Sequence, residues 1–175
     1  MPKPQARQEE LEQAMADLLD YAFDREDVKY LLARLPREAP VTPAKVEYEL
    51  QILKIVTVGW SLSYHLHPAL RPALPEFFWQ SVRRLAAGLS QTTGRIIGQP
   101  VDYFAVLKER FETYRAALAA DPGAAEPARV IGPEFARVCG RAEDLFAFMA
   151  GSKMFISATG RVEQYLRALG LTADG

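Results

Sequence analysis

The sequence predicts an all-α fold: a single-domain bundle of five to seven helices around a central buried helix at about residues 43–67. Two observations lead to this prediction. Apolar residues recur at spacings of three and four along most of the chain, which is the period of an amphipathic helix. Prolines and glycines separate these segments, and a chain of 175 residues is long enough to bury a sizeable core.

The central segment, Leu50 to Leu66, is the most apolar run of the chain, and two interpretations compete for it. Apolar and polar or small residues alternate over 56–67, as in a half-buried strand. The helical interpretation places Thr42 at the N-cap, Pro43 in the first turn and Pro68 at the stop. We favour the helix, because no other segment is a convincing partner strand and a lone strand would leave its backbone groups unpaired.

This helix has two apolar stripes and one mainly polar strip, so we expect it to pack between two or more neighbouring helices. Gly59 lies on the stripe that contains Ile55 and Leu62. Because glycine has no side chain, we expect a neighbouring helix to approach closely there.

Before the central helix, residues 1–6 are rich in proline and predict a mobile N-terminus, so the helical domain is expected to span residues 7–170. A helix begins at about Gln8, and a second apolar set follows from Val28 to Leu35. The pattern leaves open whether these are one helix or two. Prolines at 36, 40 and 43 mark the connection that follows.

After the central helix, the pattern predicts helices over 75–93 and 101–119, both packed on the central one, with Asp102 as the cap of the second. The apolar stripe of the first contains Phe78, Val82, Leu85 and Leu89. Residues 120–133 predict a flexible loop because they are rich in proline, glycine and alanine.

The last third predicts a helix from Pro133, a short apolar piece at 154–156 after Gly151, and a final helix over 161–169 that stops at Gly170. The core-facing residues of the helix from Pro133 are expected to be Phe135, Val138, Cys139, Ala142, Leu145, Phe146 and Met149. We interpret Cys139 as a small buried hydrophobic residue rather than a nucleophile.

Composition excludes several classes of function. The net charge is −1, so we expect neither nucleic acid nor a membrane surface as a partner. The N-terminus lacks the apolar region of a signal peptide, and no apolar run is long enough to span a membrane. With one cysteine, no disulfide can form within the chain, which fits a cytoplasmic protein.

The candidate ligand-binding residues are Lys54, Trp60, Tyr64 and His65, all on the central helix. His65 could ligate haem iron or transfer protons, and a desolvated Lys54 could act as a nucleophile. The more ordinary interpretations are a histidine at a helix end and a lysine that extends to the surface. No metal-binding pattern accompanies the histidines, so we expect no metal, no cofactor and no catalytic residue.

Three consecutive aromatic residues, Phe77, Phe78 and Trp79, are the candidate interface. Successive helical residues step by about 100°, so the three cannot all face one core seam. We expect one of them, Phe77 or Trp79, to be buried across the interface of a homodimer.

These features predict a non-enzymatic protein-binding or regulatory module that acts through a helical face. A protein partner other than a second copy is a further expectation. The alternative is a pocket protein that holds a small molecule or haem beside Trp60, Tyr64 and His65.

Overall fold

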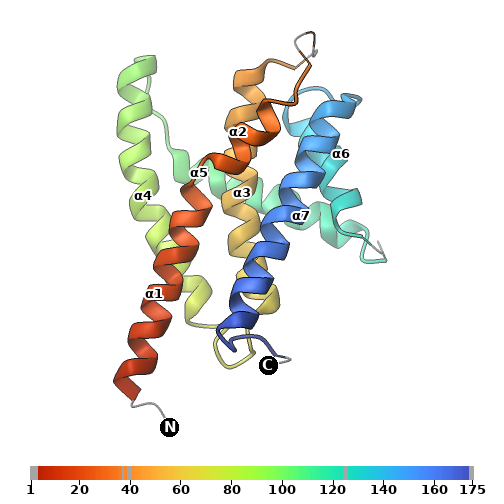
Figure 1. Cartoon of the computed structure of the whole chain (residues 1–175). Coiled ribbons are helices and arrows are strands. Elements are labelled where there is room, and N and C mark those ends of the chain that lie inside the picture. The colour runs from red at the N-terminus through yellow and green to blue at the C-terminus, as the bar shows by residue number, and fades with distance from the viewer. Residues whose placement is uncertain (1–3, 37, 39–40, 124–125, 174–175) are drawn as a thin grey trace.

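The computed structural model describes residues 4–36, 38, 41–123 and 126–173, and within these ranges the chain is all-α, as predicted. The helices are α1 (Pro4–Phe23), α2 (Glu26–Leu32), α3 (Pro43–His65), α4 (Leu74–Ile97), α5 (Tyr103–Ala120), α6 (Ala128–Val138) and α7 (Leu145–Ala168) (Figure 1). In this part of the chain, β structure is limited to an isolated bridge between Leu66 and Thr172.

The central helix is α3, so the helical interpretation of the apolar run is correct. Thr42 is extended and Pro43 is the first helical residue, although the Thr42 side chain makes no capping hydrogen bond. α3 ends at His65, and Leu66 is again extended. Every residue over 52–59 is buried, which means that other elements cover α3 on all sides.

The other helices surround α3 (Figure 1). As predicted, α4 and α5 pack on it, and α5 crosses behind it at a large angle. The most extensive contact on α3, however, is with α7, which the sequence did not identify as its main partner. One hydrophobic cluster takes buried residues from all seven helices.

Near the N-terminus, α1 and α2 are two separate helices, which answers the question that the pattern left open. Residues 1–3 of the predicted mobile segment lie outside the described residues, whereas the backbone at 4–6 is already helical. α5 begins as predicted, because the Asp102 carboxylate accepts a hydrogen bond of 2.9 Å from the Ala105 amide.

The last third of the chain differs from the prediction. The expected loop over 120–133 is too long, because α6 already begins at Ala128 and includes Pro133. The expected break after Gly151 and the separate piece at 154–156 are also wrong, since α7 is continuous from Leu145 to Ala168. The predicted stop at Gly170 is correct, with the glycine at φ +66° just after the helix.

Gly151 lies within α7, where the absence of a side chain allows close packing against α6. A Cβ atom built on Gly151 would lie 2.5 Å from the Cβ of Phe135 on α6. A Cβ on Gly132 of α6 would lie 2.2 Å from Ser152 Oγ. The two glycines therefore let α6 and α7 approach so closely that neither position has room for a larger side chain.

Candidate functional site

The outer face of α7 carries a row of exposed apolar side chains. Leu145 is 63%, Met149 41% and Ile156 60% exposed, and Phe146 beside them is 42% exposed. At about 100° per residue, the first three lie within about 40° of each other around the helix axis. We call these four residues the α7 outer face.

The local structure explains how this face is held. Asp144 caps α7 by accepting hydrogen bonds of 2.9 Å from the amides of Phe146 and Ala147. The opposite face of α7 packs into the core through residues that include Ala147, Ala150, Met154, Phe155 and Ala158. Because α7 is held against α3 and α6, the outer face is presented on a fixed support.

Several of these residues are predicted from the sequence to lie in the core, and that prediction is wrong. Phe135 and Cys139 are buried as expected, but Ala142, Leu145, Phe146 and Met149 are exposed. The prediction continued the inward face of α6 into α7 as though they were one helix. The chain turns at 139–144, so the periodicity restarts at Leu145 with a different face inward.

The aromatic residues 77–79 divide among three environments. Phe78 is fully buried, and half-buried Trp79 packs edge-on against Phe111, with ring centroids 5.4 Å apart. Phe77 is 41% exposed. Trp79 and Phe78 thus belong to the core of this chain, and of the three only Phe77 is available to a second molecule.

The predicted ligand cluster on α3 comes together only in part. Trp60 and Tyr64 stack with ring centroids 5.0 Å apart, and His65 lies edge-on to Tyr64 at 5.0 Å. Trp60 lines a cavity of about 10 Å³ with Phe111 and Phe155 among the other walls. That space is far too small for haem, and Tyr64 is 63% exposed rather than enclosed.

His65 is half-buried at the end of α3. Burial lowers the pKa of its imidazole, an effect that Glu163 opposes and Arg167 reinforces. Its Nε2 atom is buried and has no hydrogen-bond partner among the described residues. The neutral ring is therefore the form that these surroundings favour.

Lys54 lies elsewhere, about 9 Å along the helix axis from Trp60. It does not reach the surface as the ordinary interpretation suggested, because it is fully buried. Its Nζ donates a hydrogen bond of 3.0 Å to the Asp24 carbonyl and lies 3.1 Å from Asp27 Oδ2. It also lies 4.2 Å from the centre of the Tyr21 ring. The lysine therefore ties α3 to the connection between α1 and α2.

Glu49 is a second buried charge, and its burial is not evident from the sequence. Its carboxylate accepts two hydrogen bonds from Arg110 on α5, of 2.9 and 3.0 Å, and one of 2.9 Å from Lys45. These bonds raise the pKa of the Arg110 guanidinium. The spacing of Lys45 and Glu49 by four residues was a local signal, but Arg110 is distant in sequence and could not be paired with Glu49 in advance.

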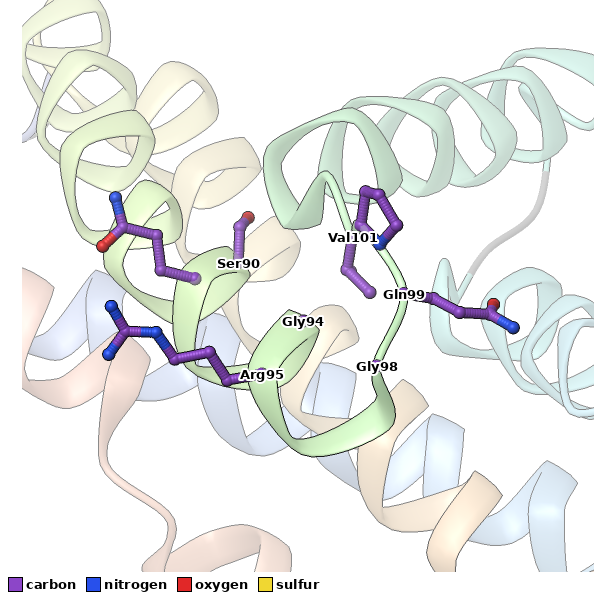
Figure 2. A pocket seen from close by; sticks show the side chains of 8 residues that line it. Ser90, Gly94, Arg95, Gly98, Gln99 and Val101 are labelled. Atoms are coloured by element: carbon purple, nitrogen blue, oxygen red, sulfur yellow. The ribbon is translucent and has the colours of Figure 1, made fainter.

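The cavity beside the end of α4 is an open hollow rather than a binding site. It measures about 510 Å³ and lies between residues 90–98 and the loop to α5. In Figure 2 the side chains of Arg95 and Gln99 extend away from each other. Ser90 Oγ already takes part in a hydrogen bond within the chain, since it accepts a 2.9 Å hydrogen bond from the Tyr103 amide. Few polar groups therefore converge there on a ligand.

Comparisons with known proteins give no further information. The chain matches no protein-family model, no curated protein and no solved structure. Among the described helices, none is both long and apolar enough to cross a membrane. The described residues also contain no cluster of three or more His, Cys, Asp or Glu side chains placed to hold a metal ion.

Proposed function

We propose that this chain is a non-enzymatic protein-binding module that acts through the α7 outer face, and that its partner on this face is a second copy of itself. The observation that carries the proposal is the exposure of Leu145, Met149 and Ile156 in one row on a rigidly held helix. Contiguous exposed apolar side chains usually mark a contact surface, and two-fold symmetric dimers are the commonest assemblies.

The pattern along α7 supports an antiparallel pairing of the two helices. A two-fold axis between Ser152 and Lys153 places Met149 opposite Ile156 of the partner subunit. The same register places Leu145 opposite Gly160 of the partner subunit, where the glycine leaves room for the leucine. Lys153 lies beside the two-fold axis, about 60° around the helix from Ile156 and therefore at the edge of the contact, where its long side chain can extend to solvent away from its copy.

The exposed apolar residues of α4 are a weaker candidate. Phe77, Leu85 and Leu89 are 41%, 48% and 39% exposed. At about 100° per residue, Phe77 is separated from Leu85 by about 80° around the helix axis. These residues are therefore more dispersed than the row on α7. This distribution shifts the proposed interface from the aromatic residues 77–79 to α7.

Multi-angle light scattering on the purified protein tests the proposal. At tens of micromolar, the unmodified chain should have the mass of a dimer, whereas the double variant Met149→Glu/Ile156→Glu should be monomeric with unchanged helix content. Leu85→Glu/Leu89→Glu is the matched control, because it places the same charges at exposed apolar positions of another helix, and it should remain a dimer.

A monomeric unmodified chain would overturn the proposal. A dimer that is lost in the α4 variant and retained in the α7 variant would overturn the assignment of the surface.

A further inference from the structure

We infer that the cavity between α2 and α7 binds a small zwitterionic ligand that carries an ammonium group and a carboxylate around an apolar body, as a free amino acid does. The cavity measures about 390 Å³ and is lined by Glu26, Asp27, Tyr30, Leu31, Lys153, Met154 and Ser157. This volume lies within the range of about 300–1,000 Å³ that is usual for small-molecule sites. The cavity lies beside the α7 outer face and shares with the proposed dimer contact only the edge at Lys153, and ligand binding does not require the dimer.

The α2 wall of the cavity carries two carboxylates, and one of them, Asp27, is fixed in place. Asp27 is held from the protein interior, because its Oδ2 atom lies 3.1 Å from the Nζ atom of the fully buried Lys54. Oδ2 is itself buried and lacks a hydrogen bond of good geometry among the described residues, so the contact with Lys54 is ionic. The Asp27 side chain as a whole is 28% exposed and lines the cavity together with Glu26. Glu26 lies 3.4 Å from Lys29 Nζ in a solvent-exposed pair, in which a ligand ammonium group can replace the lysine. A ligand ammonium group can therefore meet the Glu26 carboxylate and the Oδ1 atom of Asp27 on this side.

The α7 wall is cationic. Lys153 and Ser157 are one helical turn apart and are both exposed. Over the described residues, Lys153 has no carboxylate within 4.0 Å, whereas Lys54 and Lys29 are both ion-paired. Its ammonium group and the Ser157 hydroxyl can therefore both donate hydrogen bonds to a ligand carboxylate.

Apolar side chains lie between the charged walls. Met154 is fully buried and Leu31 is 9% exposed, and both line the cavity. Tyr30 is 58% exposed, and one side of its ring is occupied by the Arg34 guanidinium, 3.4 Å from the ring centroid. The three surfaces together match a molecule with opposite charges and an apolar part, and a ligand with only one charge would leave one wall without a partner.

Isothermal titration calorimetry with three related probes tests the inference on the unmodified protein. The probes are L-phenylalanine, phenethylamine, which lacks the carboxylate, and 3-phenylpropionate, which lacks the ammonium group. We expect L-phenylalanine to bind at least tenfold more tightly than either single-charge probe. Equal affinities for all three, stronger binding of one single-charge probe, or no binding of any probe would overturn the inference.

Single substitutions then test which wall of the cavity binds which charged group of the ligand. Lys153→Gln should weaken L-phenylalanine binding about tenfold and leave phenethylamine binding unchanged. Glu26→Gln should weaken phenethylamine binding severalfold and leave 3-phenylpropionate unchanged. Lys108→Gln, an exposed lysine on α5, is the matched control and should change none of them. If Lys153→Gln and Lys108→Gln have the same effect on L-phenylalanine, the ligand does not contact the α7 wall.

Discussion

Lys54 and His65 lie on the same helix, yet the fold gives their polar groups opposite surroundings. Lys54 is fully buried, but Asp24, Asp27 and the Tyr21 ring surround its ammonium group. His65 is only half-buried, but its Nε2 has no hydrogen-bond partner among the described residues. The charge of Lys54 is compensated and the Nε2 atom of His65 is not, so replacing the two residues should have different consequences for stability.

Replacing Lys54 should be costly for stability. Lys54→Ala removes the ammonium group that compensates Asp24 and Asp27 and leaves a buried cavity. We expect the free energy of unfolding to fall by about 3 kcal/mol. Urea denaturation measures this, with Lys108→Ala as the exposed control, expected to change stability by less than about 0.5 kcal/mol. A cost for Lys54→Ala as small as that of the control would contradict the role assigned to the buried pair.

His65 should make the fold less stable in mild acid. Burial lowers the pKa of the His65 imidazole in the folded chain below that of a histidine in the unfolded chain. As the pH falls through the ordinary pKa of histidine, the unfolded chain binds the proton more readily than the folded chain does, so the free energy of unfolding decreases.

The contribution of His65 to this pH dependence can be isolated by mutation. Between pH 7.5 and 5.5, His65→Gln should lose less stability than the unmodified protein. His67→Gln, at an exposed neighbouring histidine, should behave like the unmodified protein in urea denaturation. An identical pH dependence in all three proteins would show that His65 does not contribute.

At the scale of the helices, α3 and α4 meet at a glycine. A Cβ atom built on Gly59 would lie 2.3 and 2.8 Å from two ring carbons of Trp79. This agrees with the sequence-based expectation that a helix approaches closely at Gly59. On α4 itself, Gly88 is exposed and nothing lies within 4 Å of the corresponding position.

The same substitution should therefore have opposite effects at the two glycines. Gly59→Ala should lower the free energy of unfolding by about 1–3 kcal/mol, and Gly59→Leu by more, because Trp79 must move. Gly88→Ala should raise it by about 0.5–1 kcal/mol through the better helix propensity of alanine. Thermal unfolding of the variants measures the difference. If Gly59→Ala had the same melting temperature as Gly88→Ala, the close contact between Gly59 and Trp79 would be contradicted.

The helices that the sequence predicted well are those with clear local boundaries. Thr42-Pro43 and Pro68 bound α3, and Asp102 marks the start of α5. The start of α6 and the start and continuity of α7 were not predicted, because local rules mislead there. Pro133 lies inside a helix, and Gly151 provides packing room rather than a stop. The reason for that glycine is Phe135 on another helix, which no local pattern contains.

At the scale of the whole molecule, the candidate surface could not be predicted from periodicity. Leu145, Met149 and Ile156 have the spacing of a core-facing stripe, and the sequence does not specify which stripe of α7 the other helices cover. In the structure, the buried stripe of α7 consists of alanines together with Met154 and Phe155. The stripe that contains Leu145, Met149 and Ile156 remains exposed. This inversion is the main reason for assigning a contact function to α7.

The most direct test of that assignment is cross-linking with a short bis-maleimide at low protein concentration. In the proposed antiparallel register, residue 153 lies next to the two-fold axis, so two Lys153→Cys chains should cross-link efficiently. Gln164→Cys, exposed on the same helix, would be separated from its copy by about 34 Å and should not cross-link. The native Cys139 is buried and should not react. Rapid covalent dimers with Lys153→Cys alone are the predicted result, and equal cross-linking of the two variants, or of neither, would contradict the α7 interface.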